Sequence, residues 1–256
     1  MSGYRSRSAY KLMEIIKKFG LLNTKDNVLD LGSSPGGWSQ VLAEKIINGK
    51  VISVDLKPMD KIKNNIFIQG DFTDVECQKK ILSFVDGRID GVFSDMANNT
   101  TGNKNLDSFR TGSLCLESMR FASKILSKNG CFVSKFFMGE IFLEIKMEAK
   151  KLFDEFHIFK PDSSKSHSKE SYIICKKLLI HSIEEQPNCI IIKFKEKFWE
   201  QKRYDLLNKI NEFIKQQSIN YEVQEDTKYL IIKLKINNHH DTANIVNEFL
   251  KKLSLL

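Results

Sequence analysis

The amino-acid sequence predicts an α/β fold with a mostly parallel sheet flanked by helices, followed by a small α+β appendage. Short apolar segments alternate with amphipathic helical segments over residues 1–180, which is typical of such a sheet. A glycine-rich turn follows the first apolar segment, as it does at the ligand-binding edge of these sheets. Near residues 181–188 the pattern changes to a β-α-β-β-α order. We therefore expect one domain at 1–180 and a second, of unknown role, at 181–256.

The first domain opens with a helix expected over Ser8–Phe19, which carries an apolar stripe and stops at Gly20. The run Val28–Leu31 is the first strand, and Trp38 begins the amphipathic segment after the glycine-rich turn. Further strands are expected at Lys50–Asp55, Ile66–Gln69, Ile89–Asp95, Cys131–Phe137, Glu155–Phe159 and Ser171–Cys175. Further helices are expected near Val75–Phe84, Ser108–Leu126 and Ile141–Phe153, with a polar loop at Asn98–Asp107.

The second domain is expected to begin with a strand at Cys189–Phe194 and a helix at Phe198–Gln217. Apolar and charged residues alternate in Tyr229–Ile236, which predicts a hairpin with Ile219–Val223. Apolar residues at helical spacing between 243 and 253 predict a closing helix.

The net charge of +8 is unevenly distributed along the 256 residues. Residues 181–256 carry 12 Lys and Arg against 11 Asp and Glu, so almost the whole excess lies in residues 1–180. A basic surplus beside the glycine-rich turn favours a polyanionic substrate at that site. A generally lysine-rich composition explains the charge equally well.

The five cysteines include no Cys-x-x-Cys pair, and their odd number argues against a disulfide framework. The sequence shows no secretory signal, and no apolar run reaches transmembrane length. We therefore expect a cytoplasmic protein, with an organelle lumen as the alternative. No His, Cys and carboxylate cluster indicates a metal, and no metal is expected.

The glycine-rich turn runs from Gly32 to Gly37 and predicts a ligand with an adenosine-like body. Gly36 and Gly37 have no Cβ, so a ligand can lie directly against the backbone there. The turn is not Gly-x-Gly-x-x-Gly, because Ser34 stands at the second glycine position, and no Gly-Lys-Ser/Thr follows. These departures disfavour a dinucleotide-dependent oxidoreductase, which we keep as an alternative.

Acidic residues follow several of the expected strands, at the edge where α/β sheets bind ligands. Asp55 ends the second strand and can accept both ribose hydroxyls of a nucleoside. Asp71 is placed to reach an adenine amine or to position its loop, and Asp30 and Asp95 complete the set. Carboxylates repel a pyrophosphate but suit a cationic sulfonium. The alternative for Asp30 and Asp71 is an ordinary helix-capping role.

Two lysines are candidates for proton transfer. Lys135 lies inside the apolar strand Cys131–Phe137, where a lysine costs free energy unless it is paired or functional. Lys11 lies at the border of the apolar stripe of its helix. A lysine near a second cation in a partly desolvated site loses its proton more easily and can act as a general base. The alternative for Lys11 is a surface lysine with a buried stem.

The chain resembles the FtsJ/RrmJ family of S-adenosylmethionine-dependent RNA ribose 2′-O-methyltransferases over about residues 4–177. The segments that carry the resemblance occur in family order: Tyr4–Leu12, Leu29–Gln40, Val54–Asp60, Gln69–Phe72, Ser94–Ala97, Val133–Glu140 and Lys160–Ile173. The resemblance implies a Rossmann-like methyltransferase fold and a catalytic tetrad of Lys11, Asp95, Lys135 and Glu170. We expect Lys135 to be the base, with Lys11 easing its deprotonation and the carboxylates orienting both amines.

The resemblance also implies where ligands bind. The expected contacts to the methyl donor are Gly32, Pro35, Gly36, Gly37, Trp38, Asp55, Asp71 and Asp95. The expected contacts to RNA are Arg5, Arg7, Tyr10, Lys57, Lys165 and Lys169, with Tyr10 stacking on a base. Large-subunit (23S-type) ribosomal RNA is the expected substrate. Transfer RNA, an mRNA cap, or a catalytically silent RNA-binding module for ribosome assembly are the alternatives, and the oligomeric state is not predicted.

Overall fold

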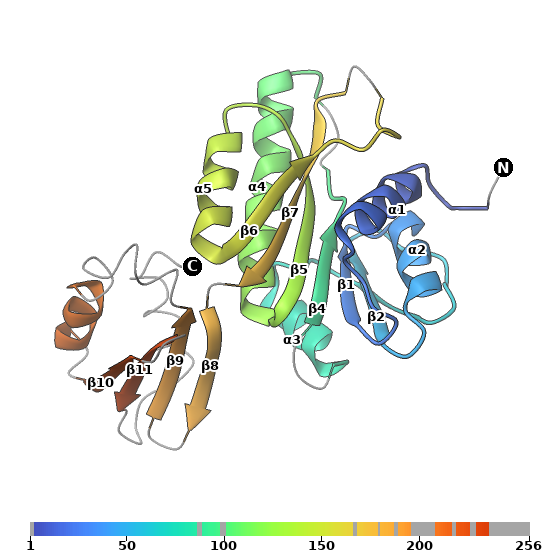
Figure 1. Ribbon diagram of the computed structural model, residues 1–256. Helices are drawn as coiled ribbons and strands as arrows, with labels where there is room; N and C mark the ends of the chain where they lie inside the picture. Colours follow the sequence, from blue (N-terminus) through green and yellow to red (C-terminus); the bar gives the residue numbers. More distant parts are fainter. Residues whose placement is uncertain are drawn as a thin grey trace. The chain divides into compact units, whose positions relative to one another are not determined.

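The computed structural model describes residues 3–85, 89–97, 101–165, 168–178, 180–186, 189–195, 208–216, 219–225 and 229–235. The chain divides into two compact units, Met1–Lys177 and Leu178–Leu256 (Figure 1). This division lies three residues before the expected boundary at 180/181. The first unit carries the glycine-rich turn and the four candidate catalytic residues.

The first unit is built on one seven-stranded sheet, which confirms the predicted α/β class. Its strands lie in the order β3-β2-β1-β4-β5-β7-β6. They are β1 (Asn27–Leu31), β2 (Lys50–Asp55), β3 (Asn65–Gln69), β4 (Ile89–Ser94), β5 (Leu126–Phe137), β6 (Phe153–Phe159) and β7 (Glu170–Leu178). The pairs β1–β2, β1–β4, β2–β3 and β4–β5 are parallel, and β7 runs antiparallel to β5.

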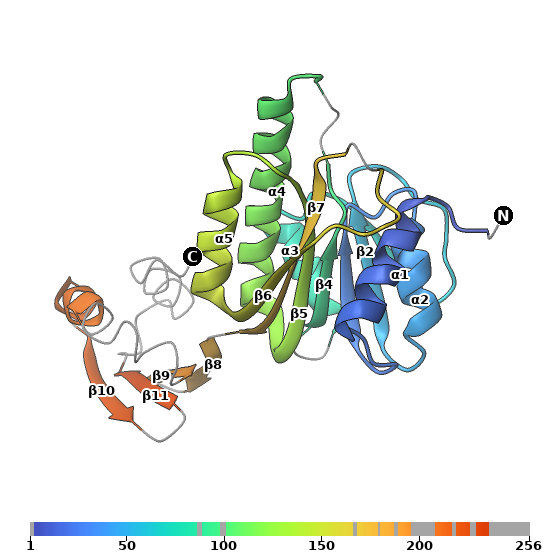
Figure 2. The same cartoon turned by 45° about the horizontal axis from the view of Figure 1, so that its top comes forward.

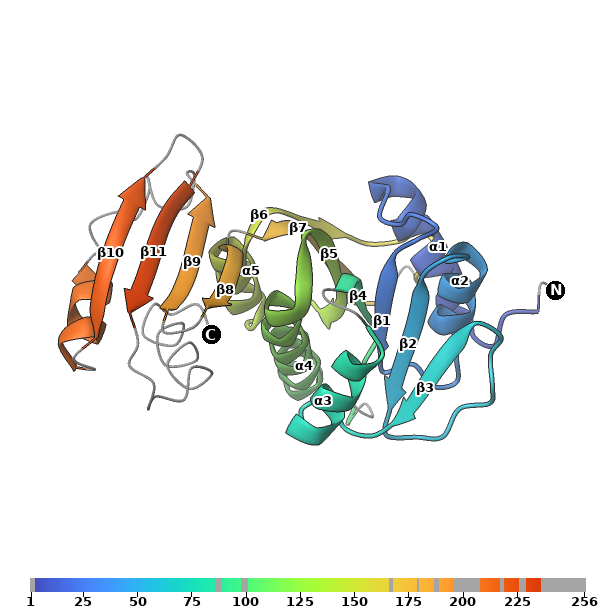
Figure 3. The same ribbon diagram turned by 90° about the horizontal axis from the view of Figure 1, so that it is seen from below.

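Helices cover both faces of this sheet. They are α1 (Ser8–Phe19), α2 (Gly37–Lys45), α3 (Val75–Ser83), α4 (Lys104–Ile125) and α5 (Phe142–Leu152). Helices α1 and α2 lie on one face, and α3, α4 and α5 lie on the other (Figures 2 and 3). This arrangement follows from strand alternation, because successive side chains of a buried strand point to opposite faces.

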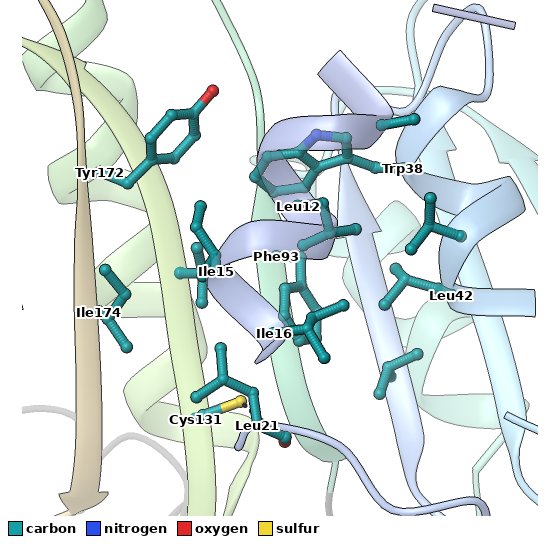
Figure 4. Packing of buried hydrophobic residues seen from close by; sticks show 14 of the residues in the cluster. Leu12, Ile15, Ile16, Leu21, Trp38, Leu42, Phe93, Cys131, Tyr172 and Ile174 are labelled. Atoms are coloured by element: carbon teal, nitrogen blue, oxygen red, sulfur yellow. Dashed lines mark hydrogen bonds between the residues drawn. The ribbon is translucent and has the colours of Figure 1, made fainter. Parts of the chain in front are cut away.

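The core on the α1 side is a layer of apolar side chains from two helices and five strands (Figure 4). Leu12 and Ile15 of α1 are fully buried, and Trp38 of α2 is 2% exposed. They pack against Phe93 and Tyr172 of the sheet. The apolar stripe predicted for α1 is therefore the surface by which this helix attaches to the sheet.

Three elements begin two or more residues before their predicted starts. Helix α4 begins at Lys104, four residues before the expected start, because the Asn103 side chain accepts hydrogen bonds from the backbone of Asn105 and Leu106. Strand β5 begins at Leu126 rather than Cys131, and a register shift opposite β4 accommodates the extra residues. Strand β6 begins at Phe153, directly after α5.

The second unit contains a four-stranded antiparallel sheet in the order β10-β11-β9-β8. Its strands are β8 (Ile180–Gln186), β9 (Cys189–Lys195), β10 (Asn220–Glu225) and β11 (Tyr229–Lys235). Residues 208–216 form a helix, which agrees with the described part of the predicted helix 198–217. Strand β8 was not predicted, because residues 181–186 contain a single apolar residue. The predicted closing helix at 243–253 lies outside the described residues.

No helix in the described parts of the chain is long and apolar enough to cross a membrane.

Candidate active site

A cavity of about 900 Å³ lies at the carboxyl ends of the parallel strands of the first unit. Gly32 follows β1, Asp55 ends β2, Asp71 follows β3 and Asp95 follows β4, and all four line this cavity. Parallel strands present their carboxyl ends at one edge, so residues far apart in sequence meet there. Four of the eight expected donor contacts are therefore at the cavity, and its lining includes a further carboxylate, Glu117.

Asp55 fixes the backbone of two segments that line the cavity. Its Oδ2 accepts a hydrogen bond from the Ser34 amide at 2.8 Å, and its Oδ1 accepts one from the Lys57 amide at 2.8 Å. Asp71 makes a local turn instead, because its Oδ1 accepts from the amide and the hydroxyl of Thr73 at 2.9 and 2.8 Å. This turn precedes α3, whose N-cap is Asp74, so Asp71 does not have the helix-capping role considered as its alternative.

Protein atoms, rather than open space, cover Gly36 and Gly37. A Cβ built on Gly37 would lie 1.9 Å from Ser6 Oγ, and one built on Gly36 would lie 2.9 Å from Ile62 Cδ1 and 3.0 Å from Arg5 Cδ. The cavity lining includes Gly32 and Ser34 but none of Pro35, Gly36, Gly37 and Trp38. The missing Cβ makes room for Ser6 of the N-terminal segment at Gly37, and for Ile62, Met59 and Arg5 at Gly36. Contact of the donor with Pro35, Gly36, Gly37 and Trp38 stays a prediction.

Trp38 is a core residue in this structure. Its Nε1 donates a hydrogen bond to the carbonyl of Ser8 at 2.9 Å, and its ring lies 5.7 Å from the Tyr172 ring at a 31° tilt (Figure 4). It joins α2 to α1 and packs on Tyr172 from the core side.

The four candidate catalytic side chains form two ion pairs. Lys135 Nζ lies 2.9 Å from Asp95 Oδ1 and donates a second hydrogen bond to the Asp95 carbonyl oxygen at 2.5 Å. Lys11 Nζ lies 2.6 Å from Glu170 Oε1. All four side chains are largely buried, at 9% to 18% exposure. Charge pairs at this burial are screened little by salt.

Strand register explains the meeting of these residues. Lys135 of β5 is the direct partner of Tyr172 on β7, and Phe137 is the partner of Glu170. Since side chains alternate along a strand, Lys135, Tyr172 and Glu170 share the face covered by α1. Lys11 reaches the same face from α1, where its neighbour Leu12 is fully buried.

Tyr172 links the two ion pairs and was missed by the sequence reasoning. The side chain is fully buried, and its hydroxyl donates a hydrogen bond to Asp95 Oδ1 at 3.0 Å. Burial raises the pKa of Tyr172 well above its ordinary value, and the charges of Asp95 and Glu170 raise this pKa further. The phenol therefore stays protonated and acts as a donor. The signal in the sequence was its position two residues after Glu170 on a predicted strand.

The loop before β7 is attached to α1. Glu14 accepts hydrogen bonds from the amides of Asp162 and Ser163 at 2.7 and 3.0 Å. The hydroxyl of Ser164 then donates to Glu170 Oε1 at 3.1 Å, the same oxygen that binds Lys11. Glu170 is thereby fixed from both sides.

The expected RNA contacts fall into two groups. Arg7, Lys57, Lys165 and Lys169 are exposed, and Tyr10 is 40% exposed with its ring edge-on to Tyr4. Arg5 is also exposed, but its guanidinium donates hydrogen bonds to the carbonyls of Pro35, Asp60 and Lys61. Arg5 thus already has oxygen acceptors from its own chain.

Asp30 is a buried acidic residue beneath the glycine-rich turn. Its Oδ2 accepts a hydrogen bond from Ser39 at 2.6 Å, and Ser39 is linked in turn to Ser53. Burial raises the pKa of Asp30 to about 7, with smaller contributions from the charges of Asp95 and Asp55. In the described part of the chain, no group of three or more His, Cys, Asp and Glu could hold a metal ion.

Comparison with protein families matches residues 4–178 to the model described as FtsJ-like methyltransferase. A protein named ribosomal RNA large subunit methyltransferase E from Pelagibacter ubique is 51% identical over 176 residues, which cover 69% of this chain and 87% of that protein. A protein of the same name from Hahella chejuensis is 44% identical over 176 residues, covering 68% and 85%. Residues 179–256 lie outside the family match.

Solved structures resemble the same part of the chain. A Plasmodium falciparum protein assigned as a ribosomal RNA methyltransferase is 34% identical with a TM-score of 0.62, covering 69% of this chain and 99% of that one. Human methyltransferase-like protein 13 in complex with SAH has a TM-score of 0.50 at 11% identity, covering 66% and 81%. The second likeness concerns the fold alone.

Proposed function

Because this chain belongs to the FtsJ-like methyltransferase family, we propose that it transfers a methyl group from S-adenosylmethionine to a ribose 2′-hydroxyl of RNA. The proposed substrate is large-subunit, 23S-type ribosomal RNA, which would place the reaction in the cytoplasm and in ribosome biogenesis. The names of the relatives support this substrate. The observation that carries the proposal is the convergence of Lys11, Asp95, Lys135 and Glu170 beside the cavity.

The cavity suits the proposed donor. When bound, S-adenosylmethionine supplies a methyl group on a cationic sulfur. The lining of this volume of about 900 Å³ has more acidic than basic side chains, which favours a cation over the pyrophosphate of a dinucleotide. The carboxylates are Asp55, Asp71, Asp95 and Glu117, and the basic side chains are Lys57, Arg120 and Lys124. Gly32, with φ of 76°, brings the backbone of the first turn to the same cavity.

Lys135 is the proposed general base. An uncharged amine has two N–H bonds and one lone pair. The two N–H bonds match the two acceptors offered by Asp95, its carbonyl oxygen and its Oδ1. The lone pair is then free to take the proton of the 2′-hydroxyl. Positioning and proton removal are the main requirements, because the methyl sulfonium is already a good electrophile.

Lys11, Glu170 and Tyr172 are proposed to hold this arrangement. Glu170 fixes the Lys11 amine at the edge of the site, where a cation attracts the phosphate beside the target ribose. Tyr172 donates to Asp95 and thereby fixes the carboxylate that orients Lys135. The exposed basic residues Arg7, Lys57, Lys165 and Lys169 are the proposed phosphate contacts, and Tyr10 the proposed stacking residue.

The test is methyl transfer from labelled S-adenosylmethionine by the wild-type chain and by Lys135→Ala. Intact large ribosomal subunits, free ribosomal RNA, transfer RNA and a capped RNA compete as substrates, total RNA is assayed separately, and mass spectrometry locates the methylated position. We expect ribose methylation of large-subunit RNA by the wild type, with loss of at least about 100-fold in Lys135→Ala.

The donor affinity of Lys135→Ala should survive, because Lys135 does not line the cavity. Retained methyl transfer would remove Lys135 from the role of base. Labelling of transfer RNA or of a capped RNA, and not of large-subunit RNA, would show that the proposed substrate is wrong. Absence of transfer to total RNA by the wild type would favour a silent binding module.

A further inference from the structure

The N-terminal segment, residues 3–8, covers the outer side of the glycine-rich turn. The Arg5 amide donates to the Gln40 side chain of α2 at 3.3 Å, and Gln40 Nε2 donates back to the Gly3 carbonyl at 3.3 Å. Ser6 fills the space at Gly37, and the Ser8 carbonyl accepts from Trp38. The segment that leads into α1 is therefore packed directly on the turn that follows β1.

Arg5 makes the most distant connection in this segment. Its Nη1 donates to the Asp60 carbonyl at 2.7 Å and to the Pro35 carbonyl at 3.4 Å. Its Nη2 donates to the Lys61 carbonyl at 2.9 Å. The guanidinium thus joins the glycine-rich turn to residues 60–61, which belong to the loop between β2 and β3.

The two segments that Arg5 joins form one wall of the donor cavity. Ser34 of the turn and Asp55 to Lys57 at the end of β2 line that cavity. On the inner side, the Ser34 hydroxyl donates to the Pro58 carbonyl at 3.2 Å, and the Ser34 amide donates to Asp55. Arg5 closes the connection on the outer side, so the wall is fixed from both sides.

We propose that Arg5 is a positioning residue for donor binding, which holds the glycine-rich turn and the β2–β3 loop together. It replaces the expectation that Arg5 contacts RNA phosphate. This inference rests on the proposed function for the identity of the donor. Its chemistry is specific to arginine: a planar fork with five N–H donors reaches three carbonyls on two segments, whereas a lysine amine presents its three donors from one point.

The experiment measures the Kd of S-adenosylhomocysteine by calorimetry, without RNA, for the full-length wild type, Arg5→Ala and Arg5→Lys. We expect both variants to bind about 3- to 10-fold more weakly, which is the size of one or two exposed charge-assisted hydrogen bonds. The KM for S-adenosylmethionine should rise by a similar factor. The kcat and the KM for RNA should stay within about 2-fold of the wild type.

Two further variants are the controls. Lys17→Ala removes an exposed cation at the C-terminal end of α1, the end away from the glycine-rich turn. This variant should leave the Kd of S-adenosylhomocysteine unchanged. Arg7→Ala removes an exposed arginine two residues away and should raise the KM for RNA without altering this Kd. A purely structural role for Arg5 would instead lower kcat and the melting temperature together with the affinity.

The outcomes separate the inference from the proposed function. Wild-type affinity in both Arg5 variants, with a raised KM for RNA in Arg5→Ala that Arg5→Lys restores, would overturn the inference and return Arg5 to phosphate binding. A wild-type chain that fails to bind S-adenosylhomocysteine would overturn the assigned donor and the inference together. A parallel fall in kcat and melting temperature would overturn the positioning role alone.

Discussion

The contact between Ser6 and Gly37 allows a direct test of why the turn has a glycine at position 37. In Gly37→Ala the new Cβ would lie 1.9 Å from Ser6 Oγ, about 1.5 Å closer than an ordinary contact. Rotation of the Ser6 side chain would break its hydrogen bond with Ser8 and still leave the two Cβ atoms 3.1 Å apart. Overpacking of this kind costs about 1–3 kcal/mol.

The double variant Ser6→Gly/Gly37→Ala relieves this clash. With glycine at position 6, the nearest atom to the new Cβ among those of residue 6 is its backbone nitrogen at 3.4 Å, an ordinary contact. Alanine is also favoured over glycine in a helix by up to about 1 kcal/mol, and Gly37 is the first residue of α2. The second change should therefore recover most of the stability lost in Gly37→Ala, after allowance for the cost of Ser6→Gly by itself.

Urea unfolding of the wild type, both single variants and the double variant measures this coupling, for which we expect about 1–3 kcal/mol. Calorimetry with S-adenosylhomocysteine runs alongside. A different result would refute the packing argument: Gly37→Ala as stable as the wild type, weakened in donor affinity, and not rescued by Ser6→Gly. The ligand, rather than the N-terminal segment, would then need the missing Cβ.

Two other changes test the buried polar groups of the site. Tyr172→Phe keeps the ring against Trp38 but removes the hydroxyl that donates a hydrogen bond to Asp95. The kcat should fall about 10-fold, the size of one hydrogen bond to a charged group, while the affinity for S-adenosylmethionine is kept. Single-turnover methyl transfer measures the rate, and an unchanged rate would contradict the bridging role. For Asp30 the folded pKa of about 7 exceeds the unfolded value of 3.8, so the folded carboxyl keeps a proton that the unfolded one has lost between these pH values. The free energy of unfolding therefore falls by about 1.4 kcal/mol for each pH unit as pH rises through this window, and it levels off at higher pH. Asp30→Asn should lack this slope in urea unfolding between pH 5 and pH 8, and an identical slope in both chains would show that Asp30 titrates normally.

Local sequence patterns were sufficient to predict most of the fold of the first unit. The apolar stripe of α1 and the apolar runs of β2, β4 and β5 identified these elements, because each buries one face or both against its neighbours. The strand predicted at Ser171–Cys175 corresponds to β7, which begins one residue earlier, at Glu170. Strand β8 was missed because its residues show no apolar alternation, and its place in a sheet depends on pairing with β9.

The candidate site was predicted in part. Lys135 stood out because a lysine in an apolar strand requires a partner, and Asp95 is that partner. Glu170 depended on the family resemblance, and so did the choice of Lys11, since a lysine at the border of an apolar stripe is equally typical of a surface residue. Tyr172 depends on the register between β5 and β7, and the cover over Gly37 depends on Ser6, thirty-one residues earlier in the chain. Contacts of this kind have no local signature.

The reversed direction of β7 has a consequence for how the site is supplied with side chains. A strand parallel to β5 would bring only its last residues to the edge that carries the cavity, and its first residues would start at the far edge, about 30 Å away for nine residues. Since β7 runs the other way, its opening residues, Glu170 and Tyr172, and the loop that precedes them arrive at the reaction edge together. One inverted strand thus brings residues 168–169, which precede it, beside chemistry that the parallel strands reach only with their ends.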